Sequence, residues 1–554
     1  MRRCALLTLT AVLGLAGPAR AADPIMPLAD VRPGMACTAL SVVHGTEISS
    51  FNAEVLDVIA DDPAAGGARL LVRVSGPAID ATGVGPGFSG SPIICDGRYA
   101  GAISEGIGDY GNKVVLATPI EAILGARPSA AAGARKAPAL LRAARPLTGP
   151  LVVSGLSSHT RGLLTRAAAR VDRTVLAAPP GPLGGYPPQA LVPGAAVAAA
   201  ISTGDISLGG VGTVAYRDGD QVFAFGHALD GLGRRSLFMQ DAYVFGVIGN
   251  PVAIPDLGAM TYKLTSSGGH MLGSVTNDTF SAIAGNLGAG PPAIPLRVTA
   301  RLHGSGKRET LDSSLADERN LELGAGLSLV APLAASTALD RLLNSIEPVA
   351  LTACTRFRVR EWHKPIGFCN PYFDGFTPLS DIAKAGTMVD AFDLAPLHIR
   401  GSAVSMDVTR GFADDVVVGA QPPQHVRAGT TVPVRVALRR RGGGSRSLTV
   451  KVPIPAGVRP GSRTLILEGN GFPAEEDDVL LELVEGLSGA GGAHAAAAEP
   501  RSAKQLAAAV AALHRPLGIT AHLRHRDARV VLRSDRVRFD GRARVRLQVG
   551  PARR

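Results

Sequence analysis

The spacing of turn signals constrains the fold of this chain more than any other feature. Between residues 31 and 126, short β-forming runs recur and are separated by turn-forming pairs such as Gly66-Gly67 and Asp96-Gly97. The sequence holds 67 glycines and 40 prolines, and only 4% of its residues are aromatic. Such frequent turns favour strands over long helices, so we expect a compact β-domain here. Residues 118–121 (TPIE) are typical of a capping box and predict a short helix that closes the domain.

The rest of the chain divides into further units, because 554 residues are too many for one hydrophobic core. A second β-rich block runs from about 151 to 302, a helical apolar period covers 333–346, and short strands return after 347. The pair Asp540-Gly541 predicts a hairpin turn near the end of the chain. The predicted divisions are 1–21 (signal peptide), 22–126 (first β-domain), 127–150 (linker), 151–346 (second β-domain with a trailing helix), 347–486 (β-sandwich-like accessory domain), 487–500 (Gly/Ala linker) and 501–554 (basic helix plus hairpin).

The first residues have the pattern of an export signal. Arg2 and Arg3 precede an apolar run, and residues 19–21 (ARA) match a small-x-small cleavage site, so we expect a signal peptide over 1–21. The apolar run stops at Gly17-Pro18, which is too early to span a bilayer, and no later segment has the required length and composition. These features predict a secreted, extracytoplasmic protein of the cell envelope without a transmembrane segment.

Four cysteines remain after the expected signal is removed, and an even number in an exported protein predicts two disulfides. We pair Cys37 with Cys95 and Cys354 with Cys369, because each pair then lies within one predicted domain. Four cysteines allow three pairings, and free buried thiols remain an alternative. The sequence has no Cys-x-x-Cys or His-x-x-x-His spacing, so we expect neither a metal site nor a cofactor.

The net charge of +11 arises at the C-terminal end, where residues 501–554 hold 14 Lys or Arg against three Asp or Glu. Alternation in the predicted hairpin puts its arginines on one face and its apolar side chains on the other. The simplest interpretation is a solvated sheet face, and the alternative is a contact with an anionic cell-envelope surface. The tail offers no aromatic stacking groups for bases, so we expect no nucleic acid partner.

Residues 87–93 (GFSGSPI) place Ser89 in a glycine-flanked turn directly before an apolar strand. Gly87 and Gly90 remove side chains that would crowd an incoming carbonyl group, and they permit positive φ angles. A serine nucleophile is presented in this way, and the N–H groups of Gly87 and Ser89 would then form its oxyanion hole. The alternative is an ordinary Gly/Ser/Pro turn in an all-β protein.

A serine hydroxyl attacks well only when a neighbouring base accepts its proton. Among the 12 histidines, His44 and His227 lie at the ends of predicted strands, where a side chain can face a cleft. His44 belongs to the same β-domain as Ser89, whereas His227 belongs to the second β-rich block. The position of each residue along the chain does not decide between them.

Two segments of the chain resemble a known family. Residues 87–93, followed by Asp96-Gly97 and Gly101-Ala102, resemble the nucleophile segment of the stage IV sporulation protein B serine peptidases, and residues 224–227 (AFGH) are similar to the histidine motif of that family. Further similar segments are 47–55 and 272–285, so that the resemblance covers most of 31–126 and 205–300. It implies two chymotrypsin-like half-barrels in which Ser89 is the nucleophile and His227 the general base. His44 then becomes a structural or rim residue.

This sequence departs from the family pattern in two ways. In the family the histidine half comes first, whereas here Ser89 precedes His227 by 138 residues, so the two halves are permuted. Triads occur in several chain orders, so permutation does not forbid catalysis. The position of the family's acid falls near 74–76, which holds no carboxylate. The candidates for an orienting acid are Asp230, Asp241 and Asp205.

The sequence thus predicts a mainly β protein with two chymotrypsin-like half-barrels, a C-terminal β-sandwich-like module and a small α/β module. The predicted function is that of an exported serine endopeptidase acting on a protein or peptide, its own chain included. The alternative is an envelope scaffold or binding protein that retains the peptidase fold without the chemistry. The missing acid motivates that alternative.

Overall fold

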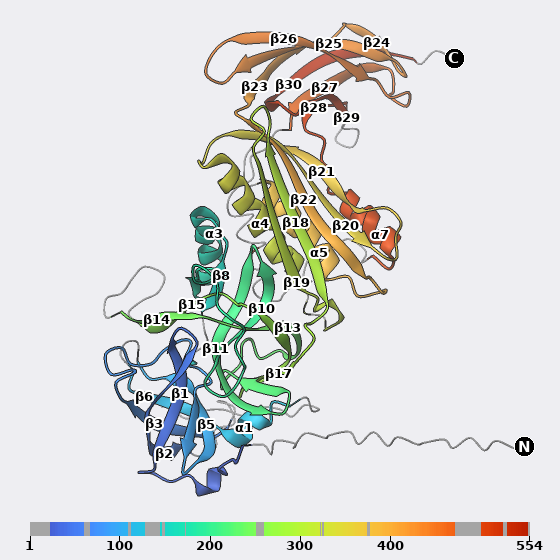
Figure 1. Cartoon of the computed structure of the whole chain (residues 1–554). Coiled ribbons are helices and arrows are strands. Elements are labelled where there is room, and N and C mark those ends of the chain that lie inside the picture. Colours follow the sequence, from blue (N-terminus) through green and yellow to red (C-terminus); the bar gives the residue numbers. More distant parts are fainter. Residues whose placement is uncertain are drawn as a thin grey trace, which may run out of the picture.

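The computed structural model describes residues 23–59, 67–108, 112–127, 145–146, 150–171, 173–250, 260–321, 323, 326–373, 377–470, 483, 500–523 and 529–551. The expected signal peptide, most of the 127–150 linker and residues 487–499 lie outside the described residues. Strands account for 52% of the residues and helices for 14%, which confirms the mainly β class. Two barrels lie at one end of the molecule, a sheet with helices lies in the middle, and a second β-module lies at the other end (Figure 1).

The first barrel closes from six antiparallel strands. In spatial order they are β1 (Ala36–His44), β2 (Glu47–Ile59), β3 (Arg69–Ser75), β6 (Val114–Pro119), β5 (Arg98–Gly106) and β4 (Pro92–Cys95), which pairs back to β1. Apolar side chains alternate with polar ones along β2, where Phe51, Ala53 and Val55 are buried and Asn52 and Glu54 are exposed. This two-residue period directs one face of β2 into the barrel core and leaves the other face exposed to solvent, as is common in antiparallel sheets.

The second barrel also closes from six antiparallel strands. In spatial order they are β10 (Ala196–Gly204), β11 (Ser207–Asp218), β12 (Gln221–Ala224), β17 (Ile283–Leu287), β16 (Met271–Asp278) and β13 (Gly233–Asp241), which pairs back to β10. If strands are counted within each barrel, both barrels follow the order 1-2-3-6-5-4. Two closed six-stranded barrels of this kind confirm the predicted chymotrypsin-like double barrel.

Short elements close and connect the barrels. The helix that the capping box predicts is α1 (Ile120–Leu124), but no side chain caps it, and Thr118 instead donates its hydroxyl hydrogen to the Gly226 carbonyl oxygen in the second barrel. A hairpin of β14 (Val244–Gly249) and β15 (Thr261–Thr265) is inserted between β13 and β16. It lies beside β1 of the first barrel (Figure 1). The remaining short elements are η1 (Leu28–Asp30), β7 (Arg145–Pro146), β8 (Leu151–Ser154) and β9 (Val175–Ala177).

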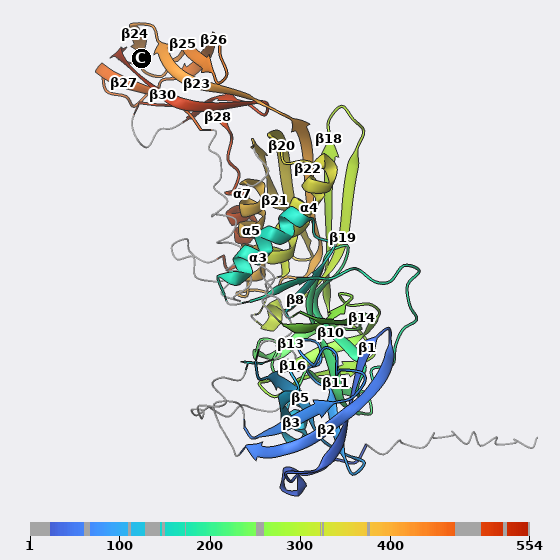
Figure 2. The same cartoon turned by 90° about the vertical axis from the view of Figure 1, so that its left-hand side faces the viewer.

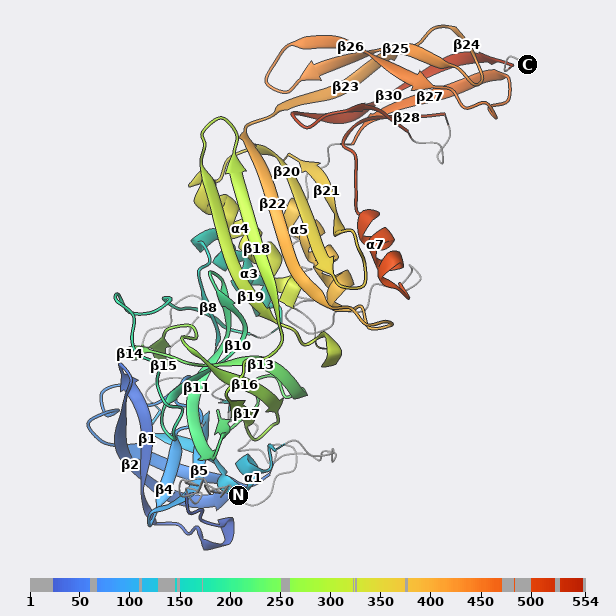
Figure 3. The ribbon, with the colours of Figure 1, turned by 45° about the vertical axis from the view of Figure 1, so that its right-hand side comes forward.

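The middle of the molecule continues the sheet of the second barrel, because β10 also pairs with β19. The added strands are β19 (Arg308–Ala316), β18 (Ala293–Leu302), β22 (Ile399–Arg410), β20 (Val349–Val359) and β21 (Ile366–Tyr372). The helices are α3 (Ser158–Ala169), α4 (Gly326–Leu343), α5 (Thr377–Asp390) and α7 (Ala503–Ala511), with η2 (Arg319–Leu321) before α4. They lie along this sheet (Figures 2 and 3). The first three strands after residue 347, which are β20, β21 and β22, therefore belong to this middle layer.

Helix α4 is the central core element of this layer. It corresponds to the helix predicted over 333–346, and it begins earlier because the apolar run before Pro332 also packs inside. The expectation that no later segment has the length and composition to span a bilayer is wrong for α4, which has both. However, 89% of its apolar window is buried within the described structure. A helix that is apolar on all sides suits the core of a large protein as well as a bilayer.

The C-terminal module is a β-structure with its own core. Its strands are β23 (Ala413–Gln421), β24 (His425–Arg427), β25 (Thr431–Arg440), β26 (Ser445–Pro453), β27 (Gly461–Gly469), β28 (Gly518–His522), β29 (Arg529–Arg533) and β30 (Val537–Gly550). The predicted tail hairpin is wrong, because Asp540-Gly541 lies inside the single strand β30. Gly541 has a φ of +75°, and at this point β30 exchanges its neighbour β23 for β27. The pair thus makes an irregularity within a strand and not a turn.

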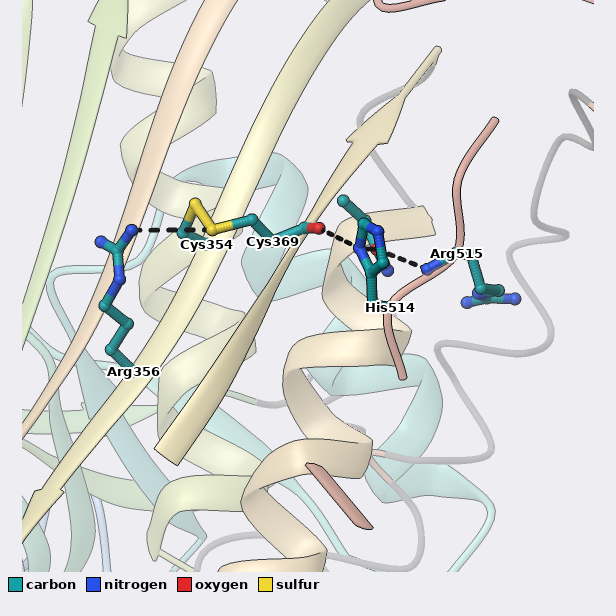
Figure 4. Close-up of a disulfide and its surroundings, with 6 residues drawn as sticks. Cys354, Arg356, Cys369, His514 and Arg515 are labelled. Atoms are coloured by element: carbon teal, nitrogen blue, oxygen red, sulfur yellow. Dashed lines mark hydrogen bonds between the residues drawn. A yellow bond between two sulfur atoms is a disulfide. The ribbon is translucent and has the colours of Figure 1, made fainter. Parts of the chain in front are cut away.

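Both predicted cysteine pairs form disulfides, and each joins directly paired residues of adjacent antiparallel strands. Cys37 on β1 is bonded to Cys95 on β4 in the first barrel. Cys354 on β20 is bonded to Cys369 on β21 in the middle layer, where the Cys369 carbonyl oxygen also lies 2.7 Å from His514 Nδ1 (Figure 4). Each bridge therefore constrains one core and does not connect two modules.

Candidate functional site

The Ser89 turn is a tight loop that leads into β4. Phe88 N–H donates to the Gly85 carbonyl, and Ser91 N–H donates to the Phe88 carbonyl. Gly87 and Gly90 have φ angles of +95° and +91°, which other residues rarely adopt. The two glycines that flank the serine are therefore required by the backbone conformation of this turn.

Gly90 also lets the turn approach the second barrel. A Cβ atom at this position would lie 1.9 Å from the Thr213 carbonyl oxygen and 2.6 Å from the Phe225 nitrogen. Thr213 N–H donates to the Ser89 carbonyl, and the Thr213 carbonyl accepts from Phe225 N–H. The Ser89 turn, β11 and the segment before His227 are thus joined by consecutive hydrogen bonds.

The His227 segment leaves the second barrel in an unusual conformation. Phe225 has a φ of +71° and Gly226 a φ of +68°, so two successive residues occupy the left-handed region at the end of β12. A phenylalanine in that region is strained, and the strain persists only where surrounding contacts over-determine the conformation. Here the Thr118 hydroxyl of the first barrel holds Gly226 through a 2.6 Å hydrogen bond to its carbonyl. The structure brings the Ser89 turn and the His227 segment to the same junction between the barrels.

The ring of His227 is oriented by its own loop. Nδ1 lies 2.6 Å from the Ala228 carbonyl oxygen. A carbonyl oxygen only accepts hydrogen bonds, so Nδ1 carries the proton in the neutral ring and Nε2 carries the lone pair. This is the tautomer that a general base facing a serine requires.

The peptide groups of the expected oxyanion hole are fixed through their carbonyl oxygens. The Pro86 carbonyl accepts from Lys263 N–H, and the Phe88 carbonyl accepts from Ser91 N–H, both at 2.9 Å. In a trans peptide the N–H points away from the carbonyl, so the Gly87 and Ser89 N–H groups face away from these partners. Within the described part of the chain, neither N–H donates a hydrogen bond, and Ser89 Oγ has no partner. Such unsatisfied groups are rare in folded proteins and often mark reactive sites.

Access to these groups is closed. Ser89 is 1% exposed and His227 is 4% exposed.

A cavity of about 340 Å³ lies elsewhere, between β21 and the connection from α7 to β28, where Tyr372, His514 and Leu517 line it. Its lining residues His514 and Arg515 lie near the Cys354–Cys369 disulfide (Figure 4), and none of its lining residues belongs to the barrels. Among the described residues, no three His, Cys, Asp or Glu side chains form a metal-binding group.

The three acids proposed from the sequence have other partners. Asp241 is fully buried and accepts hydrogen bonds from Tyr186 Oη at 3.0 Å and from the backbone N–H of His270 at 2.7 Å. His270 Nδ1 also lies 2.9 Å from Asp241 Oδ2, so the histidine that this carboxylate contacts is His270. Asp230 forms an ion pair with Arg235, and Asp205 accepts from the backbone N–H of residue 312.

Asp278 is a buried carboxylate that sequence reasoning missed. It lies at the end of β16 and accepts the N–H groups of Leu229, Asp230 and Gly231 at 2.7, 2.8 and 2.9 Å. Burial raises its pKa above the ordinary range, although these N–H groups and Arg235 act in the opposite direction. Asp278 therefore shapes the loop that directly follows His227. The available signal was the polar run at 277–279 (NDT).

His44, the other candidate base, lies apart from this junction. It is the exposed last residue of β1, and its ring centroid is 6.4 Å from that of Tyr243. Comparisons with known proteins add nothing to this picture, because no family model, no curated protein and no solved structure matches the chain.

Proposed function

We propose that this chain is an exported serine endopeptidase in which Ser89 is the nucleophile and His227 the general base. One observation carries the proposal. Ser89 lies in the connection between the third and fourth strands of its barrel, His227 lies in the equivalent connection of the other barrel, and the two connections meet at one junction. A catalytic pair divided between two equivalent loops is recognised by its geometry, whatever its order along the chain.

In the proposed reaction, Ser89 Oγ forms a bond to the carbonyl carbon of a peptide while its proton passes to His227 Nε2. The carbonyl oxygen becomes an oxyanion, which the Gly87 and Ser89 N–H groups stabilise. Collapse breaks the C–N bond, and the His227 proton passes to the leaving amine. Water then attacks the acyl-enzyme with His227 again as the base, which releases the acid and restores Ser89.

Asp278 acts in this scheme as a positioning residue. Its carboxylate holds three successive N–H groups after Ala228, whose carbonyl oxygen faces His227 Nδ1. Asp278 therefore supplies part of what an acid in direct contact with the imidazole provides in other serine peptidases.

A non-catalytic scaffold is the second candidate, and the burial of Ser89 and His227 favours it. An extended peptide could reach Ser89 Oγ only after a local separation of the barrels, because 1% of the residue is exposed. If the chain is a peptidase, we therefore expect slow turnover and a preference for flexible substrate segments, including flexible segments of the chain itself. The scaffold proposal expects no bond cleavage at all.

Two further parts of the proposal concern location and partners. The two disulfides suit an oxidising compartment, and with the expected signal peptide they support secretion. On β30, Arg544 and Arg546 are exposed, while Arg542 is paired with Glu468. We infer an anionic envelope surface as the partner of this arginine face, with an affinity that falls as salt increases.

The proposal is tested by incubating the full chain with a mixture of unstructured peptides and counting new termini by mass spectrometry. We expect cleavage by the wild type, and at least about 10³-fold less cleavage by Ser89→Ala and by His227→Ala, because both groups act as one unit. His44→Ala is the matched control, since His44 is exposed away from the junction, and it should cleave within about twofold of wild type. Equal cleavage by wild type and Ser89→Ala would remove Ser89 from the mechanism.

A further inference from the structure

The β14–β15 hairpin belongs to the second barrel but is docked on the first. It is inserted between β13 and β16, yet Thr261 Oγ1 donates to the Thr82 carbonyl at 2.5 Å and Lys263 N–H donates to the Pro86 carbonyl at 2.9 Å. Gly85 permits this approach, since a Cβ atom there would lie 1.9 Å from the Thr261 carbonyl oxygen. Strand β15 thus runs beside the segment that leads into the Ser89 turn.

Lys263 is buried at this contact, and no carboxylate among the described residues is its partner. The residue is 3% exposed, and its Nζ lies 2.6 Å from Ser41 Oγ, 3.2 Å from Thr213 Oγ1 and 4.4 Å from the centre of the Phe88 ring. Burial lowers its pKa to about 7, and no described charged group offsets that effect. A buried amine with hydroxyl partners alone is costly to keep in a fold.

The hydrogen bonds around Lys263 converge on Gly87. Ser91 donates its hydroxyl hydrogen to Ser41 Oγ at 2.9 Å, and the Thr213 hydroxyl donates to the Gly87 carbonyl at 2.9 Å. Thr213 Oγ1 accepts from Lys263, and its own proton goes to the Gly87 carbonyl at 2.9 Å and not to Ser41 Oγ, which is farther away at 3.4 Å. The chain of donors therefore runs from Lys263 through Thr213 to the backbone of the serine turn.

Both peptide groups that flank Gly87 depend on Lys263. The Pro86–Gly87 peptide is held directly by the backbone N–H of Lys263, and the Gly87–Phe88 peptide is held by its side chain through Thr213. The stem of Lys263 also fits against Gly87, where a Cβ atom would lie 2.8 Å from Lys263 Cβ. The Gly87 N–H lies in the Pro86–Gly87 peptide plane, so the backbone N–H of Lys263 sets its direction. The second plane restrains it indirectly, because a turn of either plane changes the φ and ψ angles of Gly87 and shifts the other.

We propose that Lys263 is a positioning residue that fixes the Gly87 N–H of the oxyanion hole from the opposite barrel. The inference rests on the proposed function, because it assigns to Lys263 a part in the chemistry of Ser89. It implies that the oxyanion hole is complete only while the β14–β15 hairpin is docked on the first barrel. Lys263 does not touch the reacting atoms.

A positioning role and a purely structural role predict different results for Lys263→Met. Methionine has a similar length and no charge, so it fills the space without a buried amine and should keep or raise the melting temperature. The positioning role nevertheless predicts slower chemistry at Ser89, because the Gly87 carbonyl loses its ordered donor. A structural role predicts that stability and reactivity change together.

The test is the kinetics of Ser89 labelling by a fluorophosphonate probe, resolved into the maximal rate constant and the concentration for half-maximal rate. We expect Lys263→Met and Thr213→Val to lower the maximal rate constant about tenfold, with half-maximal concentrations within about twofold of wild type. Thr213→Ser retains the hydroxyl group and should restore the wild-type rate constant. Lys113→Met, which removes an exposed lysine of the first barrel, is the matched control.

Each outcome decides the inference. Wild-type rate constants in Lys263→Met and Thr213→Val overturn it and leave the proposed function standing. Failure of Thr213→Ser to restore the rate, with lowered melting temperatures throughout, also overturns it. A wild-type protein whose Ser89 never reacts overturns the proposed function, and the inference with it. If Lys263→Met does not fold, the comparison of Thr213→Val with Thr213→Ser decides alone.

Discussion

At the scale of single residues, the site depends on backbone conformations that few residues adopt. Gly87, Gly90, Phe225 and Gly226 all have positive φ angles, and they lie on the two loops that meet at the junction. Gly90 combines this requirement with a close approach to Thr213. Any side chain at position 90 would therefore both strain the backbone and collide with the second barrel.

We predict that Gly90→Ala destabilises the protein by about 3 kcal/mol, since a left-handed conformation costs about 1–2 kcal/mol and the clash with backbone adds a similar amount. Probe labelling of Ser89 should fall at least tenfold. Gly97→Ala is the matched control, because Gly97 has a φ of +70° and no atom within 4 Å of an added Cβ. It should lose about 1 kcal/mol and label normally. Urea unfolding measures the loss of stability in both variants, and equal losses in Gly90→Ala and Gly97→Ala would contradict this prediction.

Sequence alone identified some residues of the site and could not identify others. Ser89 was predicted because a local motif of seven residues surrounds it, and the two cysteine pairs because each lies within one module. Lys263 gave no local signal, since its partner Ser41 is 222 residues away and belongs to another barrel. Long-range pairing of this kind is set by the topology of the barrels and not by any local pattern.

At the scale of elements, the notable polar side chains lie in strand connections of the two barrels and at a helix end in the middle layer, here called the helical layer. Each barrel places a candidate catalytic residue in the connection between its third and fourth strands. In the helical layer, Asp390 at the end of α5 accepts the Ser328 N–H at the start of α4, at 2.9 Å. A carboxylate near a helix N-terminus is favourable, but burial dominates here and raises the pKa of Asp390 to about 7.

We predict that Asp390 makes the helical layer less stable as pH rises. Its pKa is about 3.8 when unfolded and about 7 when folded, so its stabilising contribution is complete below about pH 4 and is lost as pH rises through 7. Asp390→Asn keeps an acceptor for Ser328 and removes the ionisation. Thermal unfolding should show the variant above wild type at pH 8 and equal to it near pH 4. A wild type that is the more stable protein at pH 8 would contradict this assignment.

Element boundaries were predicted where a period was strong and missed where a neighbour decided them. The pair Asp218-Gly219 between two β-forming runs predicts a hairpin from local sequence alone, and β11 and β12 form it. The turn expected at Asp540-Gly541 is absent, because β23 and β27 pair with successive parts of one strand. A glycine that allows a turn equally allows an irregular strand, and only the neighbours distinguish the two.

At the scale of the whole molecule, the two barrels and the middle layer have separate cores. One disulfide lies in the core of the first barrel, and the other joins two strands of the middle-layer sheet. The first barrel encloses one cluster that includes Cys37 and Cys95. The middle layer encloses another, against which the single tryptophan of the chain, Trp362, is packed. Tryptophan fluorescence therefore reports on the middle layer, while Ser89 labelling reports on the barrels.

We predict that the two disulfides stabilise different parts of the chain. Replacing Cys354 and Cys369 by alanine should lower the midpoint of the tryptophan transition, with a loss of about 3 kcal/mol for a 15-residue separation. Replacing Cys37 and Cys95 should cost about 4 kcal/mol for a separation of 58 residues. That loss should appear as lost labelling at a lower denaturant concentration, with the tryptophan midpoint unchanged. Equal shifts of the tryptophan midpoint in both variants would show one cooperative unit instead.

The central claim is that Ser89 and His227 form one reactive unit across the barrel junction. Its most direct test is peptide mapping by mass spectrometry after the full chain is treated with a fluorophosphonate. We expect one phosphonyl adduct per chain, located on Ser89, and its loss in His227→Ala, while His44→Ala reacts normally. An unmodified Ser89 after prolonged treatment, or a Ser89 adduct that forms at the wild-type rate in His227→Ala, would contradict the claim.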